Sequence, residues 1–179
     1  EVPDPILNGP YDEPRWHWWL EEGKPPEKRT GRRPASYWYK PPGSPEPSNG
    51  DAGRERPGTL VELKLVNLIR SRVAAWRAEA IRGGGGVSRT TRELLEYWLR
   101  QGRAQRLFFA QIEAAETIIF LVEARADFLQ GISVPLDEPS DAQREQGLTA
   151  FRRYACKMAT GGGKTTVMAM LAAWSILNK

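Results

Sequence analysis

Apolar residues recur at three- and four-residue spacing in three stretches, and each stretch predicts a helix with one buried face. The first runs from Thr59 to about Ile81, the second from a Thr90–Glu93 capping box to about Gln101, and the third from about Leu107 to Leu129. The predicted buried positions are Leu65, Leu68, Ile69, Val73, Trp76 and Ala80, then Leu94, Leu95 and Trp98, then Phe108, Ile112, Ala115, Ile119 and Val122.

A fourth apolar stretch, residues 167–177, is apolar on nearly all sides and predicts a helix buried over most of its surface. The apolar run before it, residues 154–158, predicts a short strand in which Cys156 is a small buried side chain. Because one strand cannot form a sheet, we expect the chain to be a fragment, truncated at both ends.

Residues 1–58 hold most of the prolines and predict an irregular arm. Two aromatic clusters interrupt this arm, at residues 16–19 (WHWW) and 37–39 (YWY), with Arg15, Arg32, Arg33 and Lys40 beside them. The clusters are either a stacking surface for single-stranded nucleic acid or anchors that pin the arm to the main body. We favour the anchors, because the chain has 26 basic and 22 acidic residues and a formal charge of only +4.

Two further segments predict connections. Four consecutive glycines, residues 83–86, predict a flexible connector, since no strand precedes them and no lysine follows directly. Residues 130–150 predict an inserted loop with one helical turn. Leu136-Asp137-Glu138 in that loop resembles a magnesium motif, but Pro135 and Pro139 argue against the strand such a motif needs, so we interpret it as solvated loop.

The glycine-rich segment between the predicted strand and the fourth helix is the candidate binding site. It reads Met158-Ala159-Thr160-Gly161-Gly162-Gly163-Lys164-Thr165. A strand, a glycine-rich turn and a helix form a phosphate-binding P-loop (Walker A), in which backbone N–H groups surround phosphate oxygens. Lys164 then supplies charge to the β- and γ-phosphates, and the Thr165 hydroxyl is placed to hold Mg²⁺.

This P-loop departs from the usual pattern at its first position, where Met158 replaces a glycine. The departure argues against a kinase or small GTPase and favours the helicase version, in which the Thr-Gly-x-Gly-Lys-Thr part matters. The alternative is a glycine-rich turn before an ordinary helix.

Three stretches together resemble superfamily-two (DEAD/DEAH-type) helicases related to the Res subunit of type III restriction enzymes. They are residues 108–117 (FFAQIEAAET), 157–166 (KMATGGGKTT) and 168–171 (MAML). The leader, residues 8–14 and 31–34, is similar to that of one branch of bacterial restriction-endonuclease-like helicases. The resemblance covers nearly all of this chain but only the start of the family's length.

The resemblance implies that Gln111 reads the edge of adenine, with Phe108 or Arg106 over the base. It implies ATP at Thr160–Thr166 with Mg²⁺ on Thr165, DNA as a partner, and a DNA methyltransferase subunit as a further one. Gln111 precedes Lys164 by 53 positions, longer than the family shows, and the insert at 130–150 accounts for the excess. A helix-surface amide is the alternative role for Gln111.

We therefore expect an α/β chain, mostly helix and coil, that begins a P-loop RecA-like helicase domain. Residues 1–58 would be the arm, 59–105 a two-helix segment, and 106–179 the incomplete ATP-binding domain. In the family, the carboxylate that positions the attacking water and the arginine of a second RecA-like domain come after the P-loop in the sequence. We therefore expect negligible ATP hydrolysis from this chain alone. No apolar run is long enough to span a bilayer, so a cytoplasmic protein is expected.

Two alternatives of other classes remain open at this point. One is a P-loop NTPase without DNA activity. The other is a non-enzymatic arm in which residues 1–105 recruit a partner.

Overall fold

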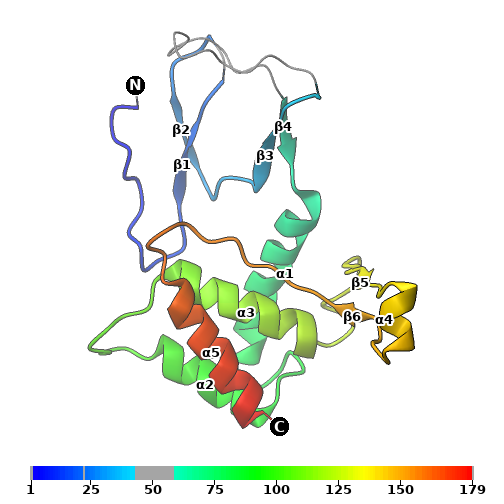
Figure 1. The fold of residues 1–179 in the computed structure, drawn as a ribbon. Helices are drawn as coiled ribbons and strands as arrows, with labels where there is room; N and C mark the ends of the chain where they lie inside the picture. Colours follow the sequence, from blue (N-terminus) through cyan, green and yellow to red (C-terminus); the bar gives the residue numbers. More distant parts are fainter. Residues whose placement is uncertain (1, 22, 43–58, 179) are drawn as a thin grey trace.

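The computed structural model describes residues 2–21, 23–42 and 59–178, which form a small mixed α/β protein. Its longer elements are β1 (Trp16–Trp19), β2 (Glu27–Thr30), β3 (Ser36–Tyr39), β4 (Thr59–Glu62), α1 (Lys64–Ala80), α2 (Arg89–Leu99), α3 (Phe109–Glu123) and α5 (Lys164–Leu177). The short elements β5 (Leu136–Asp137), α4 (Asp141–Glu145) and β6 (Phe151–Arg152) lie to one side. Figure 1 shows β1–β4, the hairpin arm, at one end and α1, α2, α3 and α5, the helical body, at the other.

The hairpin arm consists of two antiparallel ladders. Strand β1 pairs with β2, with Trp16 opposite Thr30 and Trp19 opposite Glu27, and β3 pairs with β4. The prediction of an irregular arm is therefore wrong at Trp16–Trp19, Glu27–Thr30 and Ser36–Tyr39, because the aromatic runs that interrupt the prolines favour strands. The other described residues before residue 43 are irregular, as predicted. Residues 43–58, which include Pro45 and Pro47, lie outside the described residues.

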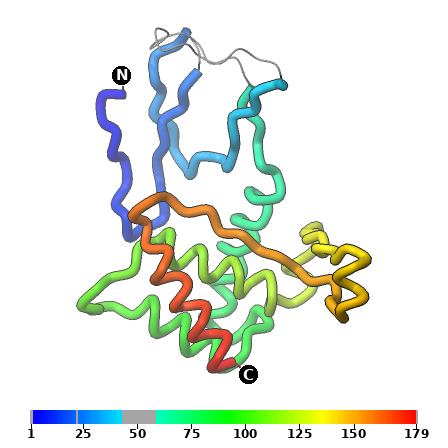
Figure 2. Tube along the Cα trace, in the orientation of Figure 1, coloured from blue at the N-terminus to red at the C-terminus, as the bar shows by residue number. Residues whose placement is uncertain are grey.

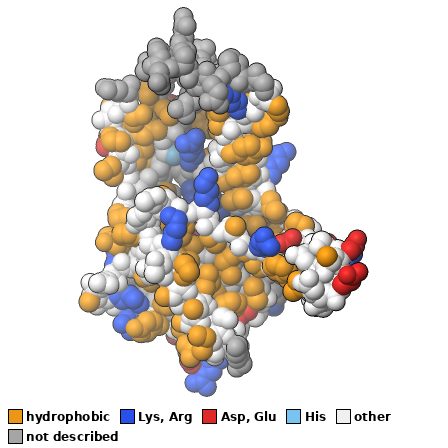
Figure 3. All heavy atoms as spheres, in the orientation of Figure 1, with side chains coloured by type: hydrophobic (Ala, Val, Ile, Leu, Met, Phe, Trp, Pro, Cys, Tyr) orange, Lys and Arg blue, Asp and Glu red, His pale blue; other side chains and the backbone are white. Residues whose placement is uncertain are grey.

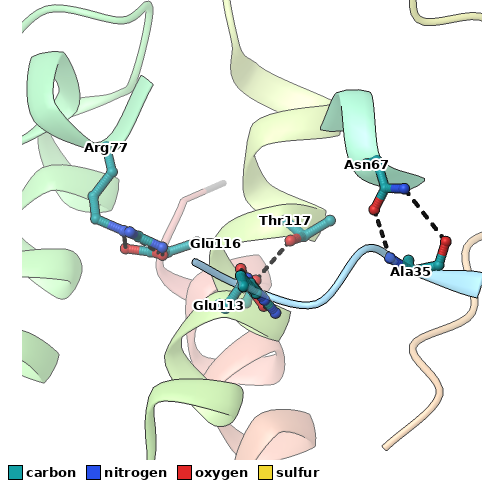
Figure 4. A network of polar contacts seen from close by, with 7 residues as sticks. Ala35, Asn67, Arg77, Glu113, Glu116 and Thr117 are labelled. Atoms are coloured by element: carbon teal, nitrogen blue, oxygen red, sulfur yellow. Dashed lines mark hydrogen bonds and ion pairs between the residues drawn. The ribbon is translucent and has the colours of Figure 1, made fainter. Parts of the chain in front are cut away.

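Helix α1 begins at Lys64, later than predicted, because Thr59–Glu62 pairs with β3 instead. The side chain of Asn67 in its first turn ties the helix to the start of β3. Its Oδ1 accepts from the Ala35 N–H at 2.7 Å and its Nδ2 donates to the Ala35 carbonyl at 3.3 Å. These two hydrogen bonds between Asn67 and Ala35, shown in Figure 4, therefore connect the arm to the body.

The core of the helical body lies between α1, α2, α3 and α5. Its fully buried members include Val73, Trp76, Ala80, Leu95, Ala115, Ile119 and Phe120. The rings of Trp76 and Phe120 meet edge to face at 5.7 Å. The predicted buried faces are confirmed at most positions and wrong at Leu65 and Val122, which are exposed. Segments on either side of residue 105 pack into this one core.

The four glycines between α1 and α2 form a packed turn, so the prediction of a flexible connector is wrong. The Gly85 carbonyl accepts from Trp76 Nε1 at 3.1 Å and from the Arg125 N–H at 3.3 Å. The predicted Thr90 cap is also wrong: Ser88 caps α2, and its hydroxyl accepts from the Thr91 N–H at 3.0 Å. These bonds tie the connector to α1, to Arg125 and to the first turn of α2.

Residues 130–150 contain β5 and the short α4, as the prediction of a loop with one helical turn required. Strand β5 pairs with β6, the only strand between α4 and α5 in the described chain. Asp137 in β5 forms an ion pair with Arg153 at 2.6 Å, on the surface. The loop interpretation of Leu136-Asp137-Glu138 is therefore wrong for Leu136 and Asp137, which form this two-residue strand, although the Asp137 carboxylate is solvated.

The strand predicted before the glycine-rich loop does not form. Residues 153–159 run without strand pairing from β6 across the helical body to α5, the orange segment of Figure 2. Within residues 2–21, 23–42 and 59–178, every ladder is antiparallel and none includes this segment. A RecA-like fold, which has a parallel sheet, is therefore not confirmed. For the same reason Cys156 is exposed rather than buried.

Helix α5 is less buried than its composition predicts. Val167 and Met170 face the core, whereas Met168, Ile176 and Leu177 are 69%, 68% and 58% exposed. An all-round apolar helix needs cover on several sides, and α3 and α2 supply it on one side.

Candidate functional site

The glycine-rich loop is bent into a closed turn ahead of α5. The Gly162 N–H donates to the Ala159 carbonyl at 3.1 Å, and Gly161 has a φ of 78°, as the third residue of a type II turn requires. Gly163 then caps α5 with φ 79° and ψ 41°. Both conformations are left-handed and favour glycine, so the glycines at these two positions build the bend.

The bend leaves backbone donors free at the start of α5. Thr166 and Val167 donate to the Gly163 carbonyl, at 3.0 and 3.3 Å. Within the described residues, the N–H groups of Lys164 and Thr165 donate to no acceptor, because they precede the first intrahelical bonds. Free N–H groups and the positive end of the helix dipole together suit an anion.

Lys164 lies over this loop. Its Nζ donates to the Ala159 carbonyl at 3.0 Å, across the turn, and the residue is exposed. The ammonium is thus held against the glycine-rich turn rather than in an ion pair elsewhere. Thr160 and Thr165 are exposed beside it, and Thr166 is half-buried.

Gln111, in the first turn of α3, lies directly against the loop despite its distance in sequence. A Cβ built on Gly163 would stand 1.9 Å from Gln111 Nε2, so any other residue there would have to displace the Gln111 amide. Gln111 is buried, and its Oε1 accepts from the Phe108 N–H at 2.9 Å. The residue therefore caps α3, and it also brings its amide nitrogen to the loop. The helix-surface alternative is wrong, because the side chain is not on the surface.

The segment before α3 is covered by the N-terminal leader. The Phe109 N–H donates to the Pro10 carbonyl at 2.9 Å, and the ring of Tyr11 lies 5.5 Å from that of Phe108. Arg106 pairs with Asp12 at 3.1 Å and stacks on Tyr11 at 4.8 Å. Both residues predicted to cover a base, Phe108 and Arg106, thus contact Tyr11, which the sequence did not single out.

Sequence reasoning missed Tyr11 and Asp12 because they lie about 150 positions before the loop. The Asn8-Gly9-Pro10 turn that precedes them was a usable signal, since it points to a bend that needs an anchor. In the structure the Asn8 side chain supplies that anchor: its Oδ1 accepts from the Arg15 and Trp16 N–H groups, at 2.8 and 3.0 Å.

Two ion pairs hold α3 in place behind the site. Glu116, fully buried, accepts from Arg77 of α1 at 2.6–2.9 Å, and Glu113 pairs with Arg32. Figure 4 shows Arg77 and Glu116 facing each other, with Glu113 one turn away. Burial raises the pKa of the Glu116 carboxyl, although its bonds to Arg77 oppose the shift. The guanidinium groups of both arginines lie over Phe109, at 5.5 and 5.6 Å.

Metal ligands are sparse at this site. No group of three His, Cys, Asp or Glu side chains among the described residues could hold a metal ion. The Thr165 hydroxyl by itself fits only a metal that takes its other ligands from phosphate and water, as Mg²⁺ does.

Comparison with known proteins adds no assignment: no protein-family model matches this chain, and the curated proteins and solved structures yield no match either. As for membranes, every helix in the part of the chain that the structure describes is too short or too polar to cross one.

Proposed function

We propose that this chain binds a nucleoside triphosphate at Thr160–Thr166 and is the N-terminal part of an ATP-dependent DNA helicase or translocase. The observation that carries the proposal is the closed glycine turn with free N–H groups at the start of α5 and the Lys164 ammonium held over it. Backbone donors and one cation at a helix N-terminus match a chain of phosphates.

Each residue of the loop has a distinct role in this proposal. Gly161, Gly162 and Gly163 bring the backbone close to the phosphate oxygens, and Lys164 releases the Ala159 carbonyl to contact them. Thr165 is the hydroxyl that would hold Mg²⁺, with Thr160 and Thr166 on the flanks. The metal, when bound with the nucleotide, neutralises charge on the phosphates.

The base would lie on the side of Gln111. One lone pair of its Oε1 caps α3, so the second lone pair and the Nε2 hydrogens are what it offers to adenine. Phe108 and Arg106 lie on the same side, in contact with Tyr11.

The DNA motor, its service in restriction and a methyltransferase partner rest on the resemblance alone. A cytoplasmic location rests on the lengths of the apolar runs in the sequence. The test is turnover: in the longer protein, ATP hydrolysis should rise with DNA and be lost in Lys164→Ala, while this chain alone should release negligible phosphate. Turnover indifferent to DNA would instead favour a P-loop NTPase of another kind.

Nucleotide binding is tested on the chain itself, by calorimetric titration with Mg-ATP and with GTP. Lys164→Ala should weaken ATP binding at least tenfold, whereas Lys157→Ala, an exposed lysine before the loop, should leave it unchanged. Equal effects of the two variants would contradict a specific role for Lys164. Wild-type protein that binds no nucleotide would overturn the proposal.

A further inference from the structure

The hairpin arm exposes aromatic rings that the helical body does not cover. Tyr37, Trp38 and Tyr39 of β3 are 47%, 51% and 44% exposed. Because side chains alternate along a strand, Trp38 faces one side of the ladder and the two tyrosines face the other. Anchors to the body would be buried, so the anchor interpretation is wrong for this cluster. Adjacent exposed aromatic rings mark a binding surface.

The first hairpin pairs its aromatic rings with cations. Lys28 lies over the ring of Trp16 at 4.9 Å, and Arg29 lies over the ring of Trp19 at 4.5 Å. The register places Trp19 and Arg29 on one face and Trp16 and Lys28 on the other. Each face therefore combines a flat apolar ring with a positive charge.

The arm carries a hollow in two adjoining parts, one along the first hairpin and one at the junction with α1. One part, of about 650 Å³, is lined by His17, Trp19, Glu27, Lys28, Arg29, Thr30, Arg32 and Pro34. The adjoining part, of about 340 Å³, shares Arg32 and Pro34 and adds Arg33 and Arg70 among its lining residues. Figure 3 shows Lys and Arg side chains along the middle of this face, with hydrophobic side chains on both sides.

The cations of this hollow are only partly neutralised. Arg29 pairs with Glu27 and Arg32 with Glu113. Within the described residues, Arg33 and Arg70 form no ion pair, although Glu13 and Glu62 also line the hollow. Burial, and then the charge of Arg32, lower the pKa of Arg70, and the Glu113 carboxylate opposes the shift. A half-buried arginine beside another arginine leaves room for an anion.

We propose that the hairpin arm binds single-stranded nucleic acid, with bases stacked on the exposed rings of β3 and β1 and phosphates on Lys28, Arg33 and Arg70. Flat rings next to unpaired cations match a strand whose bases are exposed and whose backbone is charged. An acidic peptide would use the cations but leave the rings of Tyr37, Trp38 and Tyr39 without stacking partners. The surface is separate from the glycine-rich loop and does not depend on nucleotide binding there.

The test is titration of a fluorescent oligo-dT of about 15 nucleotides, followed by anisotropy and by quenching of tryptophan emission. Trp38→Ala should weaken binding by about tenfold, the loss of one stacked base. The double variant Arg33→Ala/Arg70→Ala should make the negative slope of the logarithm of the binding constant against the logarithm of the salt concentration shallower by about 1.4. That change corresponds to the loss of two phosphate contacts. Circular dichroism confirms that each variant is folded, and Tyr39→Ala replaces Trp38→Ala if that variant is not.

The matched control is Tyr97→Ala in α2. Tyr97 is 49% exposed and carries Arg100 and Arg103 over its ring, at 3.9 and 5.3 Å, but lies outside the arm. It should leave binding unchanged, and so should Lys164→Ala, which separates this surface from the nucleotide site. The proposal is overturned if wild type binds no oligo-dT or if the arm variants bind it as wild type does. It is also overturned if Tyr97→Ala loses as much affinity for oligo-dT as Trp38→Ala does. Competition by poly-glutamate equal to that by oligo-dT would assign the surface to acidic proteins and overturn it too.

Discussion

Trp76 in the helical body is fully buried, and its Nε1 donates to the Gly85 carbonyl, whereas Trp38 in the hairpin arm is 51% exposed. The two regions thus use one residue type in opposite ways. In the body, tryptophan removes apolar area from water and closes a turn, which stabilises the fold. In the arm, Trp38 keeps about half of its area in water, so it contributes less to stability and its exposed part stays available to a ligand.

Charged side chains follow the same division. The body buries Glu116 against Arg77, while the arm keeps the Arg29–Glu27 pair at the surface. A buried pair is costly to break because the remaining charge is left without water, whereas an exposed pair is replaced by water at little cost. We conclude that the helical body contributes most of the stability and that the hairpin arm exposes side chains to which a ligand can bind.

The largest expected effect comes from truncating the two tryptophans. Trp76→Ala should lower the free energy of unfolding by about 3–5 kcal/mol, because it opens a cavity and removes the bond to Gly85. Trp38→Ala should change it by about 0.5 kcal/mol or less. Urea denaturation followed by circular dichroism measures both. Similar losses in the two variants would contradict the division between body and arm.

Next in size is the effect of breaking an ion pair. Arg77→Ala should lower the free energy of unfolding by about 3 kcal/mol, since it leaves the Glu116 carboxyl buried without a partner. Arg29→Ala should leave the denaturation midpoint unchanged, because its partner Glu27 is exposed. A stable Arg77→Ala protein would mean that the pair is not essential to the position of α3.

A pair of glycines sharpens the comparison further. Gly86, in the turn before α2, and Gly31, in the arm, have φ of 82° and 85°. Alanine at either position should cost about 1–2 kcal/mol for the left-handed backbone. Gly86→Ala should cost about 1–3 kcal/mol more, because its Cβ would lie 2.6 Å from Arg125 Cγ, while nothing lies near Gly31. Equal thermal shifts would show that the turn before α2 is not packed.

The smallest expected effect is a pH dependence confined to the body. Burial raises the pKa of Glu116 above its ordinary 4.5, so the folded protein holds this proton more tightly than the unfolded chain does. The resulting stability is fully present below pH 4.5 and is lost as the pH rises through the raised folded value. The free energy of unfolding of wild type relative to Glu116→Gln should therefore fall over that window. A flat or rising difference would show that Arg77 outweighs the burial.

Helices α1, α2 and α3 were predictable because each has a local, periodic signal. Val73, Trp76 and Ala80 repeat at helical spacing, and Leu95 and Trp98 do so in α2, which suffices to place them in a core. The arm was not predictable in the same way. Its strands are four residues long, and β3 finds its partner β4 beyond residues 43–58, a pairing that no local pattern specifies.

The candidate site divides similarly. The order of residues 160–166 alone predicted a glycine turn that leads into a helix with Lys164 at its start. It wrongly predicted a strand before that turn, since pairing depends on neighbours rather than on the residues themselves. The resemblance implied only that Gln111 reads adenine. Its contact with Gly163, and the contact of Tyr11 with Phe108, entered only through the tertiary structure.

The sequence by itself determined which segments are helical, where the glycine turn bends and which residue type follows it, because these depend on backbone preferences within a few positions. The tertiary structure decided that Gln111 and the leader lie at the turn, that Cys156 is exposed and that the rings of the arm face water. Those outcomes depend on which segments, distant in the sequence, pack against one another, because that packing decides which side chains are buried.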